Sequence, residues 1–383
     1  CTRSLVGSEM CIRDRSGTPV LVGVARSLQS LGMFLSPVIG ATRIEHRTRV
    51  LPMGFLIGSL MRVQVLGLAL AGFFLSGLPA GIAACAFLTL FGFFMGMQGV
   101  IFNTLVAKVI PIERRGRLMG LRNALSGLIA AAVGNVGGHL VDANVLGNGY
   151  ASTFLLSFVL TAVGLSMLLF VREPESPVVR SRSSVGTRLG ELPALLRSDP
   201  AFTRYFLARA LATMGRMSVP FYVIYAQQQI EVDGATLGLL TMAFVLALGV
   251  GNLAWGEVAD RFGFRSVFMA SLLLWMLSAL ALMAAGDQRM VLLLIMIGLG
   301  AGSGGFQMAA QNLVLEFGSR QNLPMRIAVA NSASELVGAI GPLLGGLLVV
   351  AASYEAVFWT GIAFQAAALL WVLLAVPDPR HRI

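Results

Sequence analysis

The sequence predicts an all-α polytopic membrane protein, and three observations lead to this prediction. Hydrophobic residues make up 56% of the 383 residues and charged residues only 12%, and the mean hydropathy is +0.81. Soluble domains carry about 25% charged residues, so this composition excludes a soluble domain. Apolar stretches of roughly 20 residues, the length of a bilayer-spanning helix, recur from end to end. The charged residues fall mostly in the short segments between these stretches.

Eleven apolar stretches are long enough to be bilayer-spanning helices, and short loops connect most of them. Their ends are expected to shift by several residues in a structure. In chain order, the expected spans are Thr18–Ala41, Val50–Leu75, Pro79–Leu105, Leu118–Leu140, Ala151–Val171, Phe202–Gln227, Leu237–Trp255, Val267–Ala285, Met290–Leu315, Ile327–Val350 and Ala356–Val376.

The longest connection runs from Arg172 to about Thr203 and is rich in arginine, proline and serine, which is typical of a linker. Leu189–Leu196 is a candidate amphipathic piece within it. The segment before residue 17 lacks an apolar core and resembles translated sequencing-adapter sequence, so it is left out of the fold prediction. The expected parts are a leader over residues 1–16, an N-terminal transmembrane bundle over 17–171, a cytoplasmic linker over 172–202, a C-terminal transmembrane bundle over 203–376 and a cytoplasmic tail over 377–383.

Lysine and arginine are distributed unequally between alternate loops. One set of loops, which includes the linker and the segment around Arg261, holds nearly all of them, whereas the alternate loops hold only Arg289 beside several acidic residues. Positive charge marks the cytoplasmic side, so we expect a multi-pass protein of the cytoplasmic (inner) membrane with its linker and C-terminus in the cytoplasm. The net charge of +10 therefore indicates membrane orientation and not binding to nucleic acid.

The charged stretch from Gly256 to Arg265 is too short to cross a bilayer, so we expect a tight loop between two spans. Gly256 lets two helices approach closely, and Gly263 permits a tight turn. Asp260 lies near the C-terminus of its own helix, where the helix dipole disfavours a carboxylate. It should therefore take a cation or the N-terminus of another helix as its partner. Arg261 and Arg265 are expected to hold the loop on the cytoplasmic side.

An internal repeat relates the two halves of the chain. Residues 114–141 align with residues 322–349 without gaps, and eight of the 28 positions are identical. A second, weaker copy of the charged stretch lies at residues 41–49, where Glu45 stands one place away from the position of Asp260. The repeat offset places the partner of the sixth expected span before residue 1. We therefore expect a protein of twelve spans whose first span is missing here.

The charged stretch at residues 256–265 reads GEVADRFGFR and closely resembles the loop signature G-x-x-x-D-R-x-G-[RF]-[RK] of the major facilitator superfamily. The weaker copy, the linker and the sequence ERRGR at residues 113–117 also fit that family. The resemblance covers residues 17–376 and implies the fold of the family, two pseudo-symmetric helical bundles, with 11 of 12 transmembrane helices present.

Two departures from the family pattern bear on mechanism. The family often carries R-x-x-Q-G in its fourth helix, and Met95 stands here in place of that arginine, which puts proton coupling through it in doubt. The antiporter-type sequence G-P-x-x-G-G occurs at residues 341–346, in the eleventh family helix instead of the fifth. Export therefore does not follow from it, and a helix kink at Pro342 with close packing is the preferred interpretation.

The resemblance implies a secondary transporter that moves a small solute by alternating access, with proton coupling left open. Polar and charged residues within spans are costly and usually face a cavity or a partner, so they form the candidate site. The candidate substrate-binding or coupling residues are Arg216, Glu335, Gln98, Asn103, Gln307, Gln311, Asn312, Asn331 and Tyr222, and the candidate gating residues are Gly256, Asp260, Arg261, Gly263 and Arg265.

Each candidate also has a structural alternative. Arg216 could bind an anionic group and Glu335 could titrate, but the two could equally form a static ion pair. Asn331 and Glu335 share one helix face, since they are four residues apart. The amides could form interhelical hydrogen bonds instead of contacts with a solute. For Tyr222 and Tyr225, the preferred interpretation is an aromatic belt at the outer membrane surface, and stacking on a solute is the alternative.

Other functional classes remain as rivals. A polytopic membrane enzyme or a lipid-handling protein would need a cluster of His, Asp or Ser side chains, and a transporter-like receptor would show no flux. The three histidines are scattered and no phosphate-binding P-loop is present, so we expect no enzyme activity, no metal and no cofactor. The expected partners are a small solute and the lipid bilayer, with protons left open, no nucleic acid and a monomeric chain.

Overall fold

The computed structural model describes residues 19–175, 181, 184–229, 234–285, 288–317 and 322–377, and within these ranges the regular structure is helical with no strand. The expected leader and nearly all of the expected tail lie outside the described residues. The chain divides into two compact units, which we call the first unit and the second unit. The first unit contains residues 1–109, 129–188 and 321–332, and the second contains residues 110–128, 189–320 and 333–383.

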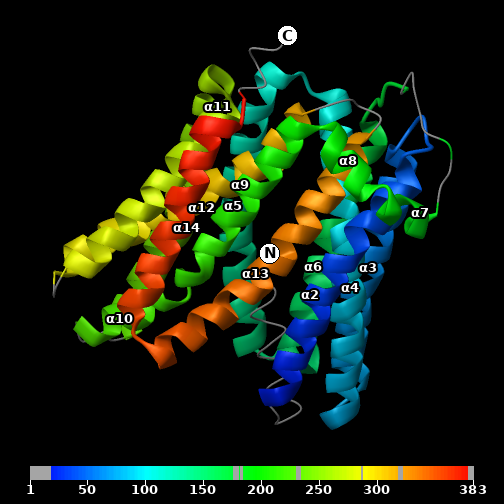
Figure 1. Cartoon of the computed structure of the whole chain (residues 1–383). Helices are drawn as coiled ribbons and strands as arrows, with labels where there is room; N and C mark the ends of the chain where they lie inside the picture. Colours follow the sequence, from blue (N-terminus) through cyan, green and yellow to red (C-terminus); the bar gives the residue numbers. More distant parts are fainter. Residues whose placement is uncertain are drawn as a thin grey trace. The chain divides into compact units, whose positions relative to one another are not determined.

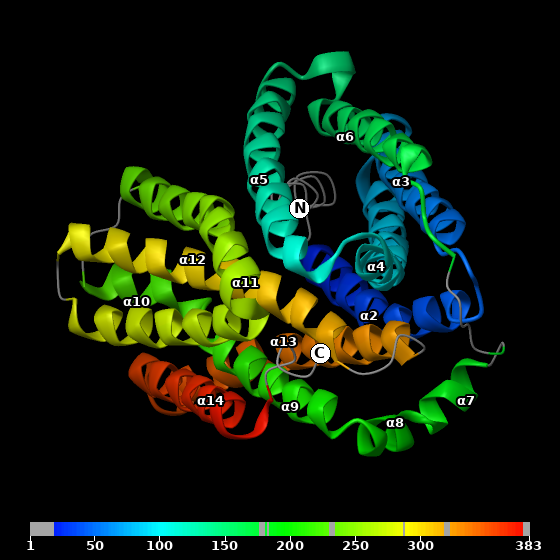
Figure 2. The ribbon, with the colours of Figure 1, turned by 90° about the horizontal axis from the view of Figure 1, so that it is seen from above.

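The first unit is built mainly from the early helices of the chain (Figure 1). In chain order these are α2 (Pro19–Ile44), α3 (Leu51–Phe74), α4 (Gly77–Val109), the later part of α5 (Ile112–Asp142), the short helix η1 (Val145–Gly147), α6 (Gly149–Ser166), η2 (Met167–Phe170), α7 (Val185–Gly190) up to residue 188 and the start of α13 (Leu323–Ala351). Helix α3 packs against both α4 and α6 (Figure 2).

Helices α2 and α4 pack with their backbones in direct contact. A Cβ added at Gly32 would lie 2.9 Å from the backbone nitrogen of Phe93, and one added at Gly92 would lie 2.5 Å from the carbonyl oxygen of Gln29. Any larger side chain would force the helices apart. Small residues allow the same close approach between helices in membranes generally, where van der Waals contact and hydrogen bonds drive helix association.

The second unit contains the later helices and the start of α5. It comprises α8 (Leu192–Ser198), α9 (Pro200–Gly215), η3 (Arg216–Ser218), α10 (Phe221–Gln229), α11 (Gly234–Ala284), α12 (Arg289–Asn312), η4 (Leu313–Glu316), the later part of α13 and α14 (Tyr354–Ala375). Helix α11 packs against α12, and α14 packs against α9 (Figures 1 and 2). Buried aromatic side chains fill the space between α9, α11 and α12, including Tyr205, Phe268, Trp275 and Phe306.

Helical structure follows the eleven expected spans, but Phe202–Gln227 is divided among α9, η3 and α10 and is not one continuous helix. Seven described segments are long and apolar enough to cross a membrane, and one of them, Leu239–Ala284, holds two of the expected spans. Helices α9 and α10 are not among these segments, since they have only 16 and 9 residues. A shorter apolar segment, Leu31–Ile44, lies in α2.

The expected loop at residues 256–265 is wrong in its extent. The structure keeps this stretch within α11, and the only non-helical residue described inside α11 is Gly263, with φ 85° and ψ 157°. Side chains with a Cβ rarely adopt this backbone conformation, so glycine confines the turn to one residue. The two expected spans on either side therefore meet at a sharp kink, and the flanking charged residues stay helical.

Two long helices contribute to both units, and they are the two that the internal repeat aligns. Helix α5 begins in the second unit and ends in the first, whereas α13 begins in the first and ends in the second. Within the first unit, Ser332 Oγ at the start of α13 donates to the carbonyl oxygen of Phe34 at 2.7 Å. Within the second unit, Asn123 Nδ2 on α5 donates to Asn252 Oδ1 on α11 at 3.3 Å. Each unit thus binds the start of a helix from the other half of the sequence.

Candidate functional site

Asp260 joins the kinked helix α11 to the start of α5 within the second unit. Its Oδ1 accepts from the backbone N–H of Gly116 at 2.8 Å, and its Oδ2 accepts from the N–H of Arg117 at 2.8 Å. Both N–H groups lie in the N-terminal part of α5, where the helix dipole favours a carboxylate. The expectation that Asp260 would find the N-terminus of another helix is confirmed.

Gly256 makes that contact possible. A Cβ at Gly256 would lie 2.6 Å from the carbonyl oxygen of Gly116, which is too close for two non-bonded atoms. A Cβ at Gly120 would lie 2.4 Å from the carbonyl oxygen of Asn252, so glycines on both helices hold the two backbones together. The predicted close approach at Gly256 is therefore confirmed, and its partner is α5.

The arginines of the kink have separate partners. Arg265 donates from Nη2 to the carbonyl oxygen of Val372 at 3.0 Å and from Nε to that of Val376 at 3.2 Å, at the C-terminus of α14. A cation is favourable there because the helix dipole is negative at that end. Arg261 donates from Nε to Glu257 Oε1 at 2.7 Å one turn earlier, and both side chains are largely exposed.

The weaker copy of the charged stretch has a different environment in the first unit. Glu45 is buried, and its Oε1 accepts from Nη2 of Arg188 on α7 at 2.6 Å. The two side chains are only 3% and 4% exposed, so this is a buried ion pair. The α7 helix lies in the segment expected to be the linker, and Arg188 ties it to the end of α2.

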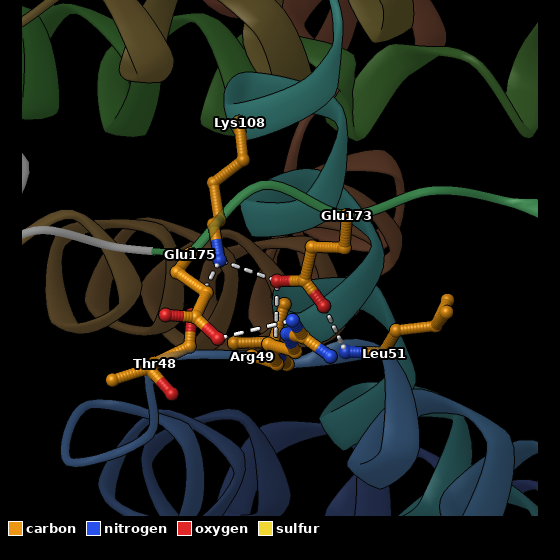
Figure 3. A network of polar contacts seen from close by, with 7 residues as sticks. Thr48, Arg49, Leu51, Lys108, Glu173 and Glu175 are labelled. Atoms are coloured by element: carbon orange, nitrogen blue, oxygen red, sulfur yellow. Dashed lines mark hydrogen bonds and ion pairs between the residues drawn. The ribbon is translucent and has the colours of Figure 1, made fainter.

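A second acid of the first unit caps a helix next to this copy (Figure 3). Glu173 accepts from the backbone N–H groups of Val50 and Leu51 at 2.8 and 2.7 Å, where α3 begins, and it also binds Lys108. Lys108 Nζ donates in addition to the carbonyl oxygen of Thr48 at 2.9 Å. Glu173 thereby satisfies two N–H groups that an uncapped helix would leave without partners.

The interior of the second unit holds a group of charged side chains. Arg209 and Arg216 come from α9 and η3, and Glu335 comes from α13. Both arginines lie within electrostatic reach of Glu335. The guanidinium carbon of Arg216 is 5.8 Å from the ring centroids of both Trp275 and Phe306. The structure thus brings together the two charged residues that the sequence singled out, and it adds Arg209 and two aromatic rings.

Arg209 was missed by sequence reasoning, although its position carries a signal. It lies seven residues before Arg216, and this spacing of about two turns would place both residues on one face of a continuous helix. Its Nη1 donates to the carbonyl oxygen of Ala310 at 3.1 Å, and Tyr205 Oη donates to the same oxygen at 2.7 Å. Arg209 is therefore held at the C-terminal end of α12, where a cation is favourable.

The amide candidates lie in varied environments. Asn103 and Asn312 are buried, and Asn312 Nδ2 donates to the carbonyl oxygen of Met308 at 2.8 Å within its own helix. Gln98 and Asn331 are half-buried, and Gln98 Oε1 has no hydrogen-bond partner among the described residues. Gln307 and Gln311 are exposed on α12.

Tyr222 and Tyr225 do not form the aromatic belt that the sequence predicted. Both side chains are buried, and each packs edge-on against Phe358 of α14 with ring centroids 5.2 Å apart. The belt interpretation is wrong because both side chains face α14 and not the surface of the unit. The sequence alone gave no sign of which side of the helix α14 would cover.

Among the described residues, no group of three or more His, Cys, Asp or Glu side chains is placed to hold a metal ion. The interior group instead combines guanidinium, carboxylate and aromatic side chains.

Known proteins of similar sequence align with this chain over only part of their length. The hexuronate transporter of Bacillus subtilis (strain 168) is 24% identical over 176 residues, which are 46% of this chain and 40% of that protein. The tetracenomycin C resistance and export protein of Streptomyces glaucescens is 28% identical over 155 residues, which are 40% of this chain and 28% of that protein. The chain thus aligns with less than half the length of these relatives.

Solved structures resemble the chain over nearly its whole length. The proton:xylose symporter XylE bound to 6-bromo-6-deoxy-D-glucose has a TM-score of 0.76 at 14% identity, covering 98% of this chain and 92% of that one. The human organic anion transporter MFSD10 has a TM-score of 0.71 at 16% identity, covering 91% and 82%. At such low identities the likeness shows the fold alone.

The sequence profile of the Major Facilitator Superfamily matches residues 8–223 and again residues 205–383, which together span almost the whole chain. The same superfamily contains structural neighbours of the chain, including the fucose transporter FucP, with a TM-score of 0.72 at 13% identity. The apolar helices agree with the multi-pass membrane topology of this family. The chain therefore belongs to the Major Facilitator Superfamily.

Proposed function

We propose that this protein is a secondary transporter that moves a small solute across the cytoplasmic membrane by alternating access. Family membership and the interior group of Arg216 and Glu335 support the proposal, because charged side chains within membrane helices usually mark solute or ion pathways. The distribution of lysine and arginine supports a cytoplasmic position for the linker and the C-terminus. The relatives and structural neighbours are named for hexuronate, tetracenomycin C, xylose and organic anions, so membership does not fix the solute.

The single observation that carries the proposal is the contact between Asp260 and the start of α5. By sequence, α5 belongs to the first half of the chain and α11 to the second, so this contact links the two halves at one end of the helices. Two charge-assisted hydrogen bonds to backbone N–H groups are strong, yet they can break without leaving a buried charge when the carboxylate becomes hydrated. Asp260 therefore acts as a latch that closes the cytoplasmic side in one state and opens in the other.

Replacing Asp260 tests this role. An asparagine has one acceptor oxygen and cannot accept from both N–H groups with two oxygens, so Asp260→Asn weakens the closed state. We expect solute flux in proteoliposomes to fall about tenfold, which corresponds to about 1.4 kcal/mol of lost stabilisation of one state. The matched control is Glu257→Gln, which removes one negative charge from the same helix and breaks only the exposed pair with Arg261. Equal flux in Asp260→Asn and wild-type protein, at equal expression, would exclude the latch.

Glu335 is the proposed coupling group if the transport is driven by protons. Its place on α13 is occupied by Gly127 on the aligned helix α5, so the acid is specific to one half and symmetric packing does not require it. We expect Glu335→Gln to abolish accumulation driven by a pH gradient and to retain solute exchange at equal pH. Accumulation that persists in this variant would show that Glu335 is structural. Saturable binding without flux in any arrangement would instead favour a transporter-like receptor.

A further inference from the structure

Arg216 lies at a break in the seventh family helix. Helix α9 ends at Gly215, the short helix η3 covers Arg216–Ser218, and α10 begins at Phe221. Gln365 Nε2 on α14 donates to the carbonyl oxygen of Gly215 at 3.3 Å, so a side chain from a neighbouring helix binds the backbone at the break. In transporters, interrupted helices commonly supply the groups that bind a solute. The break places a charged side chain where backbone geometry also departs from a regular helix.

Two aromatic rings lie beside the guanidinium of Arg216. Trp275 and Phe306 are both buried, and each ring centroid is 5.8 Å from the guanidinium carbon. A cation–π contact supplies no oxygen or nitrogen acceptor, so it does not occupy the N–H donors with a conventional hydrogen bond. In agreement, Nε of Arg216 is buried and has no hydrogen-bond partner among the described residues. A buried N–H donor without an acceptor is unfavourable, so an acceptor on a ligand would be stabilising at this point.

Arg209 and Arg216 differ in how firmly they are engaged. Arg209 donates to the carbonyl oxygen of Ala310, whereas Arg216 has aromatic neighbours and the field of Glu335. Glu335 in turn lies within reach of both arginines. Glu335 therefore interacts electrostatically with both guanidinium groups, and Arg209 is also held by the carbonyl oxygen of Ala310. The planar N–H edge of a single guanidinium matches a planar carboxylate, which it can bind through two parallel hydrogen bonds.

We propose that Arg216 binds the carboxylate group of a small organic acid and that Glu335 competes with this ligand for Arg216. The inference names the solute class of the proposed transporter and rests on that function. In the absence of ligand, Glu335 partly neutralises Arg216. A ligand carboxylate displaces that interaction, and loss of the charge of Glu335 favours the exchange. The aromatic pair fixes the guanidinium in place, so that little side-chain freedom is lost on binding.

Ligand-induced thermal stabilisation of the purified full-length protein tests the inference. The probes are three carboxylates and their neutral amides at equal ionic strength: acetate and acetamide, lactate and lactamide, benzoate and benzamide. We expect at least one carboxylate to raise the unfolding temperature in a saturable manner and its amide to have no effect. Failure of all three carboxylates to stabilise the wild-type protein more than their amides overturns the inference.

Variants then test whether Arg216 binds the carboxylate and whether Glu335 competes with the ligand for Arg216. Arg216→Gln should weaken carboxylate binding at least tenfold, and Arg216→Lys should weaken it less, because it keeps the charge without the planar fork. The matched control is Arg204→Gln on the preceding helix α9, since Arg204 is exposed and donates to the carbonyl oxygen of Ala375 at 3.2 Å. Glu335→Gln should tighten binding at least threefold, whereas a purely structural ion pair would make both substitutions weaken it. Tighter or unchanged binding in Arg216→Gln, or weaker binding in Glu335→Gln, contradicts the proposal.

A measurement on the unchanged protein decides the question if the variants do not fold. Phenylglyoxal modifies accessible arginine side chains, and mass spectrometry follows Arg216 and Arg204 separately. The carboxylate that stabilises the protein should slow modification of Arg216 at least fivefold and leave Arg204 unaffected, and equal rates at Arg216 would overturn the inference. Saturable flux of neutral solutes without carboxylate binding would leave the transport function intact and refute only the anion site. Carboxylate binding at Arg216 without flux of any solute would support the site and refute the transport function.

Discussion

The two copies of the charged stretch, at residues 41–49 and 256–265, use their acids in different ways. In the second unit, Asp260 accepts two backbone N–H groups from the start of α5. In the first unit, Glu45 is buried against a side chain, Arg188, that comes from the linker region. A carboxylate bound to a helix start can be released into water at moderate cost. A buried ion pair cannot open without leaving a charge unpaired in a poorly solvated place.

Related sequences within one chain thus place their acids in different environments. The copy at residues 256–265 has the partner expected of a reversible contact, whereas the copy at residues 41–49 has the partner expected of a permanent anchor. A further acid holds the helix that follows the first copy. The start of α3, which follows the first copy, is capped by Glu173 from the segment after α6, and Glu173 is itself paired with Lys108. The first unit thus uses two acids to fix one end of its helices and the linker that follows.

The largest expected effect is the loss of the buried pair in the first unit. Arg188→Met leaves Glu45 buried without its cation, and breaking a buried ion pair by removing one partner costs about 3–5 kcal/mol. Thermal or denaturant unfolding in detergent measures the change. The double variant Glu45→Leu with Arg188→Met restores an apolar pair and should recover most of the lost stability. If the single variant is as stable as wild type, Glu45 and Arg188 do not anchor the linker and the comparison between the two copies fails.

The intermediate effect concerns the glycine that precedes each acid. Gly256→Ala places a Cβ 2.6 Å from the carbonyl oxygen of Gly116, so α5 and α11 must separate, at a cost of about 1–3 kcal/mol. Gly40, directly before the first copy, stands at the position equivalent to Gly256. Gly40→Ala places a Cβ 3.0 Å from the Cα of Met97, and the neighbouring helix needs to move less. We expect Gly256→Ala to lower both flux and unfolding temperature more than Gly40→Ala. The reverse order would show that the first copy, and not the second, depends more on close backbone contact.

The sequence predicted much of this arrangement, but the partners of the charged residues required the structure. The eleven spans, the turn at Gly263, the close approach at Gly256 and the type of partner for Asp260 all follow from local patterns and elementary electrostatics. The extent of the loop was overestimated, because every residue around Gly263 can remain helical while a single glycine makes the turn. Charge alone marked residues 256–265 as a loop, although charged residues are compatible with a helix that emerges from a membrane.

The candidate site was predicted less completely, for a physical reason. A sequence shows which polar residues lie in spans, and so Arg216 and Glu335 were found. It does not show how each helix is rotated, and rotation decides that Tyr222 packs against Phe358 and that Arg216 meets Trp275 and Phe306. Partners from distant segments, such as Arg188 for Glu45, lie beyond any local pattern because they depend on tertiary packing.

The smallest expected effect separates the two arginines that end the copies, Arg49 and Arg265. Arg49 pairs with Glu175 at 3.0 Å, but both side chains are at least 60% exposed, and such surface pairs contribute less than about 1 kcal/mol. Arg265 donates to two carbonyl oxygens at the end of α14, where its charge also complements the helix dipole. We therefore expect Arg265→Gln to cost about 1 kcal/mol in unfolding free energy and Arg49→Gln to cost less than about 0.5 kcal/mol.

A measurement at high salt separates the two arginines further. Salt at 1 M shortens the Debye length to about 3 Å and should remove the remaining effect of Arg49→Gln. The hydrogen bonds of Arg265 to carbonyl oxygens persist at high salt, so its substitution should keep most of its cost. Equal costs for the two variants at high salt would mean that the arginines serve the same role, and that the two copies differ only in the partner of their acid.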